Sequence, residues 1–132
     1  MRLARAVDAF LRHITIERGL SAHTVAAYRR DLSGYLDWLD EHGVDDTDAV
    51  TGELVTRFAA ERAASDPPPA STSLARLQSA IRSFHRFLAR EGIVTEDPTT
   101  KLRPPKAPMR LPKALPVEDV LRLLDAAGPA PE

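Results

Sequence analysis

The sequence contains no cysteine among its 132 residues, which excludes a disulfide scaffold and any thiolate metal site. Aromatic residues are scarce at 5%, so a buried core has to be built mainly from Leu, Val, Ile and Ala. No apolar run approaches the roughly 20 residues that a membrane-spanning helix needs. The charged N-terminus, residues 1–13, does not resemble a secretory signal. We therefore expect one compact domain in a reducing, cytoplasmic compartment, without a membrane partner.

The net charge of −1 hides a strong segregation of charge along the chain. Residues 1–30 carry six Arg against two acidic residues, and residues 71–113 carry nine Lys and Arg against three. Between these basic blocks, residues 31–70 carry two Arg against ten acidic residues, and residues 114–132 are also acidic. Two basic blocks suit a polyanionic partner. Charges that gather by chance on solvated faces explain the pattern equally well, so the helices have to distinguish the two readings.

Hydrophobic periodicity predicts four helices and no strand, so the expected fold class is all-α, a small four-helix bundle. Cap and stop residues set the helix ends, because Ser and Thr bond the first free N–H groups and Gly ends the last turn. The expected helices run over residues 3–18 before Gly19, from a cap at Ser21 to Gly43, over 52–64 after a cap at Thr51, and from Ser71 or Thr72 to Glu91 before Gly92.

The composition changes at residue 98. Residues 98–116 interleave six prolines with five basic residues, which predicts an extended basic linker. Proline in the first turn, two early acidic residues and four later apolar residues then predict one more helix over 116–127. The expected domain organisation is a bundle at 1–97, a linker at 98–116, and the first helix of a further domain at 117–132.

One face of the fourth helix carries no acidic residue and lies opposite its apolar ridge. Arginines alternate there with short hydroxyl residues, and Arg can fork onto a guanine or a phosphate while small residues let the helix approach DNA closely. The alternative is an ordinary solvated face, although such faces usually pair Glu with Lys. The face comprises Thr72, Arg76, Ser79, Ser83, Arg86 and Arg90, with Arg82 at its edge.

The second helix offers a similar face opposite its own apolar stripe. Short residues around Arg30 predict a close approach to DNA, and the first-turn N–H groups near residues 21–24 suit a phosphate, although Ser21 caps the helix in either case. The face comprises His23, Ala26, Ala27, Arg30 and Gly34, with Thr24 in the first turn and Arg29 beside it.

Other chemistry is not indicated. Tyr28 and Tyr35 lie on the apolar face of their helix, so packing is expected rather than nucleophilic attack. Trp38 lies off that stripe and is expected to cover a bundle edge or to meet a partner. The histidines lack partners at metal-ligand spacing, and there is no Gly-rich phosphate loop or Ser/His/Asp arrangement. We expect no metal, no cofactor and no small-molecule substrate.

Three parts of the chain, in order, resemble the N-terminal core-binding (SAM-like) domain of XerC/XerD-type tyrosine recombinases, within the phage integrase family. The C-terminal part resembles XerD more than XerC, and phage and integron integrases share the domain. The matching segments are 17–24 (ERGLSAHT) with 27–32 (AYRRDL), 77–88 (LQSAIRSFHRFL) with 90–92 (REG), and 97–99 (DPT) with 105–106 (PK) and 111–116 (LPKALP).

The resemblance implies one half of a C-shaped clamp on a double-stranded DNA half-site, with the second and fourth helices crossing at the major groove. Family members assemble as tetramers on paired sites and recombine DNA without a metal or a high-energy cofactor, for example in chromosome dimer resolution. Their nucleophilic tyrosine and its supporting residues lie in the C-terminal domain, and none maps onto this sequence. We therefore expect DNA binding and no catalysis by these residues. The alternative is a protein-interaction bundle that assembles subunits through the acidic block at 31–70.

The expected DNA contacts follow from the two helix faces and the linker. Arginines on the faces are expected to reach bases or phosphates, hydroxyl and imidazole groups to lie close by, and linker cations to follow the backbone. The residues are His23, Thr24, Arg29, Arg30, Arg76, Ser79, Arg82, Ser83 and Arg86 on the helices, and Lys101, Arg103 and Lys106 in the linker.

Overall fold

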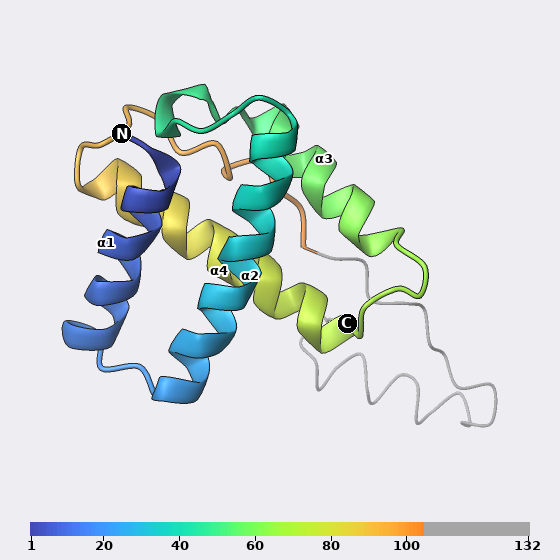
Figure 1. Ribbon diagram of the computed structural model, residues 1–132, viewed down its shortest axis with the longest axis horizontal. Coiled ribbons are helices and arrows are strands. Elements are labelled where there is room, and N and C mark those ends of the chain that lie inside the picture. The colour runs from blue at the N-terminus through green and yellow to red at the C-terminus, as the bar shows by residue number, and fades with distance from the viewer. Residues whose placement is uncertain (105–132) are drawn as a thin grey trace, which may run out of the picture.

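The computed structural model describes residues 1–104, which form an all-α bundle (Figure 1). The prediction of four helices without a strand is confirmed for these residues. No helix in this part of the chain is both long and apolar enough to cross a membrane. The predicted helix at 116–127 and most of the predicted linker lie outside the described residues. The elements are α1 (Leu3–Ile16), α2 (Ala22–Glu41), the 3-10 helix η1 (Thr47–Ala49), α3 (Gly52–Ala63) and α4 (Ser71–Arg90).

Local sequence signals place the helix ends. The Ser21 hydroxyl accepts a hydrogen bond from the Thr24 N–H at 3.2 Å, and the Thr51 hydroxyl accepts one from the Leu54 N–H at 3.2 Å, so both predicted caps are confirmed. Helix α1 ends at Ile16, two residues before the predicted end, and the chain turns at Gly19 with a φ of 63°. The short η1 helix was not predicted.

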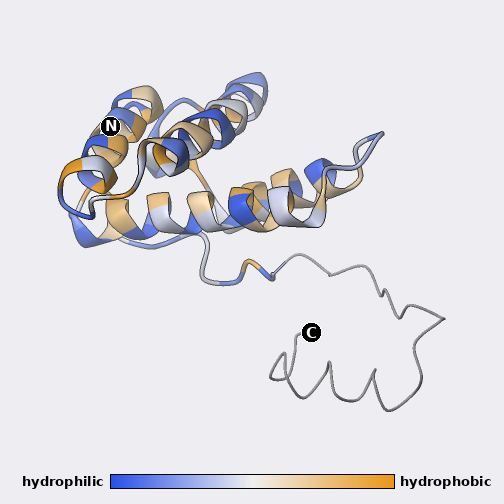
Figure 2. Cartoon of the chain, turned by 90° about the horizontal axis from the view of Figure 1, so that it is seen from below, coloured by the Kyte–Doolittle hydropathy of each residue, from blue (hydrophilic) through white to orange (hydrophobic). Residues whose placement is uncertain are grey.

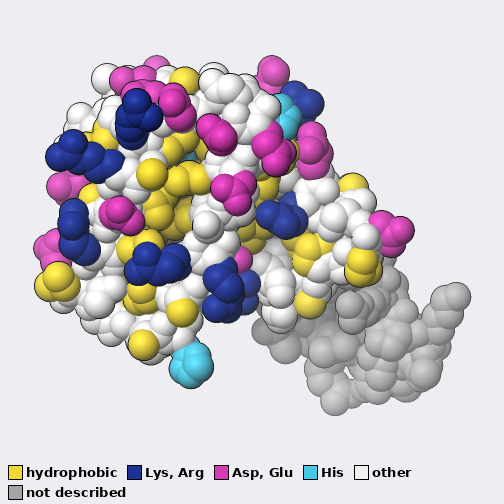
Figure 3. All heavy atoms as spheres, viewed as in Figure 1, with side chains coloured by type: hydrophobic (Ala, Val, Ile, Leu, Met, Phe, Trp, Pro, Cys, Tyr) yellow, Lys and Arg dark blue, Asp and Glu magenta, His cyan; other side chains and the backbone are white. Residues whose placement is uncertain are grey.

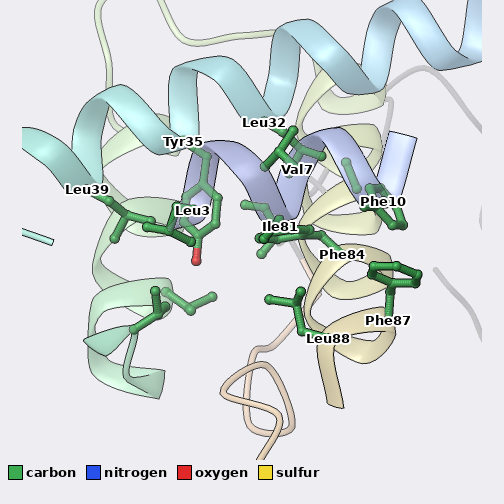
Figure 4. Close-up of a cluster of buried hydrophobic side chains, with 14 of the residues drawn as sticks. Leu3, Val7, Phe10, Leu32, Tyr35, Leu39, Ile81, Phe84, Phe87 and Leu88 are labelled. Atoms are coloured by element: carbon green, nitrogen blue, oxygen red, sulfur yellow. The ribbon is translucent and has the colours of Figure 1, made fainter. Parts of the chain in front are cut away.

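Among the helices, α4 contributes the most buried side chains to the core. It runs behind α1 and α2 and reaches α3, so it contacts all three other helices (Figure 1). Ile81, Phe84 and Leu88 are completely buried and meet side chains of α1 and α2 (Figure 4). Hydrophobic residues recur among hydrophilic ones along each helix (Figure 2), as expected for amphipathic helices that share one core. The core is therefore aliphatic with a few Phe side chains, as the composition required.

The N-terminus is tied to the loop that follows α2. The Leu3 N–H donates to the Asp45 carbonyl at 2.9 Å, and the Thr47 N–H donates to the Met1 carbonyl at 2.8 Å. The N-terminal amino group also lies 3.3 Å from the Asp46 carboxylate. These bonds hold the start of α1 beside the end of α2 and orient the acidic loop.

The first part of the predicted linker packs against the bundle. Leu102 is 8% exposed and belongs to the core, and Thr99 is buried. The Asp97 carboxylate accepts hydrogen bonds from the Thr99 N–H at 2.8 Å and from its hydroxyl at 2.6 Å, which forms a turn over 98–101. The chain is thus fixed to the bundle as far as Leu102.

A polar pair lies inside the core between α2 and α4. The Tyr35 hydroxyl and His85 Nε2 are 2.8 Å apart and share a hydrogen bond, and both side chains are buried. Burial raises the pKa of Tyr35, so its hydroxyl stays protonated. Burial also lowers the pKa of His85 to about 4, against the opposing pull of the Asp97 carboxylate, so the imidazole is neutral at pH 7.

The buried imidazole predicts a loss of stability in mild acid. His85 takes up a proton below about pH 6.5 in the unfolded chain but only below about pH 4 in the folded one, so the unfolded state binds more protons in between. The free energy of unfolding should therefore fall by about 3 kcal/mol from this group as the pH drops from 6.5 to 4.

Urea unfolding at a series of pH values measures this effect. The variant His85→Gln keeps a hydrogen-bonding side chain but does not titrate, so its curve should be flatter over the same pH range. Parallel curves for the two proteins would show that His85 is not the group responsible.

Candidate nucleic-acid interface

Helices α2 and α4 cross, and three side-chain pairs join them. The Tyr28 hydroxyl and the Ser79 hydroxyl lie 3.3 Å apart at the surface, while the Tyr35–His85 pair lies below in the core. Between the helices an ion pair links Asp31 of α2 to Arg76 of α4. The two faces predicted from the sequence thus come from helices that are fixed to one another.

The outer strip of α4 is basic and free of acidic residues. The helix contains four Arg and no Asp or Glu. Thr72, Ser79, Arg86 and Arg90 are exposed, and Ser83 is half-buried. Within residues 1–104, Arg86 forms no ion pair. This strip retains the alternation of cations and short hydroxyl residues that suits contact with phosphates and base edges.

Arg76 is already engaged by the protein. Its Nε–H donates to Asp31 Oδ2 at 2.8 Å and its Nη2 donates to Oδ1 at 3.0 Å, a two-pronged pair of charge-assisted bonds. The hydrogen bond to Asp31 raises the pKa of Arg76, with the carboxylate charge acting in the same direction. A guanidinium has five N–H donors, so the outer ones remain available although the charge is compensated.

Arg82 is directed at the chain after α4. Its Nη2 donates to the Leu102 carbonyl at 2.7 Å, and the side chain is half-buried. Because Leu102 enters the core, this bond fixes the path of residues 99–102 along the bundle. Lys101 and Arg103 beside it are exposed, whereas Lys106 lies outside the described residues.

The predicted residues of α2 point in several directions. His23 and Arg30 are exposed, and Thr24 is half-buried beside its cap. Arg30 precedes Asp31, which faces α4, so the helical turn directs Arg30 about 100° away from the ion pair. Arg29 lines a groove against α1 that also includes Arg12. The structure thus does not gather Arg29 and Arg30 at the helix crossing.

The predicted approach surface of short residues on α2 is wrong in part. Ala27 is 8% exposed, so it is buried rather than open to a ligand. A Cβ atom at Gly34 would lie 2.9 Å from Nη2 of Arg62 on α3, so this glycine makes room for a neighbouring side chain. The helical wheel placed both opposite the main apolar stripe, but a wheel of α2 alone contains neither the burial of Ala27 nor Arg62 beside Gly34.

Two residues at the crossing were missed by the sequence reasoning. Asp31 was counted in the acidic block and Tyr28 was assigned to packing, yet both contact residues of the predicted α4 face. Their spacing of three was the available signal, because residues i and i+3 share one side of a helix. Tyr35 is completely buried and burial raises its pKa, so it is not poised as a nucleophile.

Charge is segregated on the surface. In Figure 3, basic side chains spread over α1 and the lower part of α2, and acidic side chains gather along the upper edge of the bundle. The loop after α2 contributes Asp45, Asp46 and Asp48 to that acidic edge. The face seen there thus carries most of its basic side chains over α1 and α2, with some acidic ones among them, and many of its acidic side chains along the upper edge.

Three comparisons relate the chain to known proteins. Residues 7–92 match the family described as phage integrase, N-terminal SAM-like domain. The tyrosine recombinase XerD of Mycobacterium tuberculosis strain H37Rv is 40% identical over 131 residues, which cover 96% of this chain and 42% of that protein. XerD of Staphylococcus aureus strain N315 is 40% identical over 119 residues, which cover 90% of this chain and 40% of the relative. The chain therefore spans about two fifths of these curated relatives.

A solved structure shares the fold. The N-terminal domain of a phage integrase/site-specific recombinase from Haloarcula marismortui superposes with a TM-score of 0.71 at 21% sequence identity, covering 80% of this chain and 97% of that one. The likeness extends the match from sequence segments to the arrangement of the helices.

The ion pair between α2 and α4 predicts a measurable coupling. Asp31 is 12% exposed and Arg76 is 40% exposed, so the pair is partly shielded from water. A double-mutant cycle of Asp31→Ala, Arg76→Ala and both together should give a coupling of about 1 kcal/mol in urea unfolding, because the geometry is bidentate. A coupling indistinguishable from zero would mean that solvent screens the pair completely.

Proposed function

Because the chain belongs to the family of phage integrase N-terminal SAM-like domains, we propose that it binds double-stranded DNA as one half of the clamp of a site-specific recombinase. The observation that carries this proposal is the exposed, acid-free strip of α4 beside its crossing with α2. Long-range attraction to phosphates needs only net positive charge, whereas register on a duplex needs side chains in fixed positions. The crossing supplies such fixed positions.

We assign different roles to the predicted contact residues. Arg86 and Ser79 on the outer strip of α4 would contact DNA directly, with His23 and Thr24 at the start of α2 close by. Arg30 would reach the DNA phosphate backbone beside the major groove. Arg76 would use its outer N–H groups while Asp31 holds the side chain in one orientation. Arg82 would act indirectly, by holding Lys101 and Arg103 where the chain leaves the bundle.

The curated relatives, of which the chain spans about two fifths, are the setting of this proposal. A parent of the XerD type would recombine DNA through a second domain, with partner subunits on paired half-sites, in chromosome dimer resolution or in phage or integron integration. The acidic edge would repel phosphates, so it suits contacts with neighbouring subunits rather than with DNA.

Arginine variants test the DNA contacts. Arg86→Ala and Arg30→Ala should each weaken binding to a labelled duplex in fluorescence anisotropy. Each should also lower the slope of log affinity against log salt concentration by about 0.9, the value for one lost phosphate contact. Arg57→Ala is the matched control, because Arg57 is an exposed arginine of α3 that pairs with Glu61, and its slope should not change.

Two results would contradict the assignment. Equal effects of all three variants would indicate attraction by net charge alone. An absence of DNA binding at low salt, combined with a stable oligomer in sedimentation, would favour the subunit-assembly role instead.

The ion pair of Arg76 with Asp31 predicts a variant that binds DNA more tightly, in contrast to the arginine variants, which should bind it more weakly. Asp31→Asn removes the carboxylate charge and releases the guanidinium, so DNA binding should become tighter and its salt slope steeper by about 0.9. Asp40→Asn changes the net charge equally on an exposed position near the far end of α2 and should have a smaller effect. Weaker binding by Asp31→Asn would show that the orientation of Arg76 matters more than its freed charge.

A further inference from the structure

The ion pair at the helix crossing leaves one edge of the Arg76 guanidinium free. A guanidinium presents parallel N–H groups on two edges, one formed by Nε and Nη2 and the other by Nη1 and Nη2. The Asp31 carboxylate accepts from Nε at 2.8 Å and from Nη2 at 3.0 Å, so it occupies the first edge. The Nη1/Nη2 edge has no partner within residues 1–104, and the Arg76 side chain is 40% exposed.

Two hydroxyl groups lie one helical turn from this ion pair. Tyr28 stands three positions before Asp31 on α2, and Ser79 stands three positions after Arg76 on α4. Their hydroxyl oxygens are 3.3 Å apart at the surface. Two hydroxyls carry two O–H donors, and the bond between them uses one. The crossing therefore offers an unused O–H group beside the free guanidinium edge.

The charge of the ion pair favours a base edge over a phosphate as the ligand of Arg76. The Asp31 carboxylate compensates the guanidinium charge and would itself repel a phosphate, so the pair gains little from long-range attraction. The directional N–H donors are kept, and the two-pronged bond holds the planar group in one orientation. Donors of fixed direction without net charge suit the recognition of a base, which depends on hydrogen-bond geometry.

Two parallel donors select one base in the major groove of DNA. Guanine presents two adjacent acceptors there, N7 and O6, whereas adenine presents the acceptor N7 beside its amino donor. Thymine offers a single acceptor beside a methyl group, and cytosine offers a donor. The Nη1/Nη2 edge of Arg76 therefore matches guanine, and against adenine one of its N–H groups would meet another donor.

We propose that Arg76 reads a guanine in the major groove, with its Nη1/Nη2 edge donating to N7 and O6, and that Asp31 is the positioning residue. This inference rests on the proposed DNA binding and assigns base selection to one side chain at the crossing. The Tyr28–Ser79 pair donates its unused O–H to an adjacent acceptor on the DNA. Arg30 forms no ion pair within residues 1–104, so its charge remains free for the phosphate backbone.

Selection from a random duplex library tests this assignment without knowledge of the target sequence. The 132-residue protein is bound to duplexes with a randomised core, and the bound and free fractions are sequenced. The unchanged protein should enrich guanine at one position by at least about fivefold, the lower end for one bidentate contact. Arg76→Lys keeps the positive charge but lacks two parallel donors, so it should still bind DNA and lose this enrichment.

Two further variants separate orientation from charge. Asp31→Asn should bind mixed-sequence DNA more tightly and yet show a smaller guanine preference, because the released guanidinium can turn. A purely structural role of Asp31 would leave the preference unchanged. Arg30→Ala is the matched control, because loss of a phosphate contact should weaken binding to all sequences and keep the guanine preference.

Replacing one atom of the DNA tests the contact without changing the protein. In the most enriched duplex, 7-deazaguanine in place of the selected guanine removes the N7 acceptor and keeps the base pairing. The unchanged protein should bind this duplex at least about fivefold more weakly, and Arg76→Lys should bind both duplexes equally.

The outcomes distinguish the guanine contact from DNA binding itself. Binding without a guanine preference, a preference that Arg76→Lys retains, or full tolerance of 7-deazaguanine would each overturn the guanine assignment and leave DNA binding in place. A failure to bind the library at low salt would overturn the proposed function and this inference with it.

Discussion

The bundle depends on the burial of α4 between the other three helices. Leu77, Ile81, Phe84 and Leu88 form its core side, and further residues on its flanks are also buried. Little of the helix surface remains open, and what remains is the strip with Ser79 and Arg86. The element that holds the core together therefore also presents the surface proposed for DNA, so the position of that surface is fixed by packing rather than by a loop.

The crossing of α2 and α4 uses some of its charge internally. The Asp31 carboxylate accepts hydrogen bonds from two N–H groups of Arg76, and Arg82 donates a hydrogen bond to the Leu102 carbonyl. Both arginines gain a fixed orientation. Arg76 also loses part of its long-range attraction for an anion, because the Asp31 carboxylate compensates its charge. A surface built in this way relies on geometry at close range more than on net charge, which agrees with an overall charge of −1.

Two of the buried polar side chains lie on α4. His85 and Gln78 are both buried on α4, and each keeps one nitrogen or oxygen without a hydrogen-bond partner among residues 1–104. His85 Nε2 is hydrogen-bonded to the Tyr35 hydroxyl, so the desolvation cost that remains comes from the other ring nitrogen, Nδ1. Gln78 lies at a groove between α3 and α4 whose lining also includes Lys101 and Arg103. The surroundings of the two residues thus differ, because His85 lies within the core and Gln78 lines a groove at the surface.

The sequence by itself determined the helices, two of their caps, their stops and the family. These features are local or reside in short motifs: Ser21 bonds a residue three positions away, and a stripe of apolar residues needs only its own helix to be recognised. The wheel of α4 likewise predicted the exposed positions Ser79 and Arg86. Only the tertiary structure decided which predicted residues are already engaged. Asp31 and Arg76 are 45 positions apart, so their pairing follows from how two helices cross. Gly34 lies against Arg62 of α3, a helix that a wheel of α2 does not contain. A helical pattern fixes the direction of a side chain relative to its own axis, whereas its partner depends on the packing of every other axis around it.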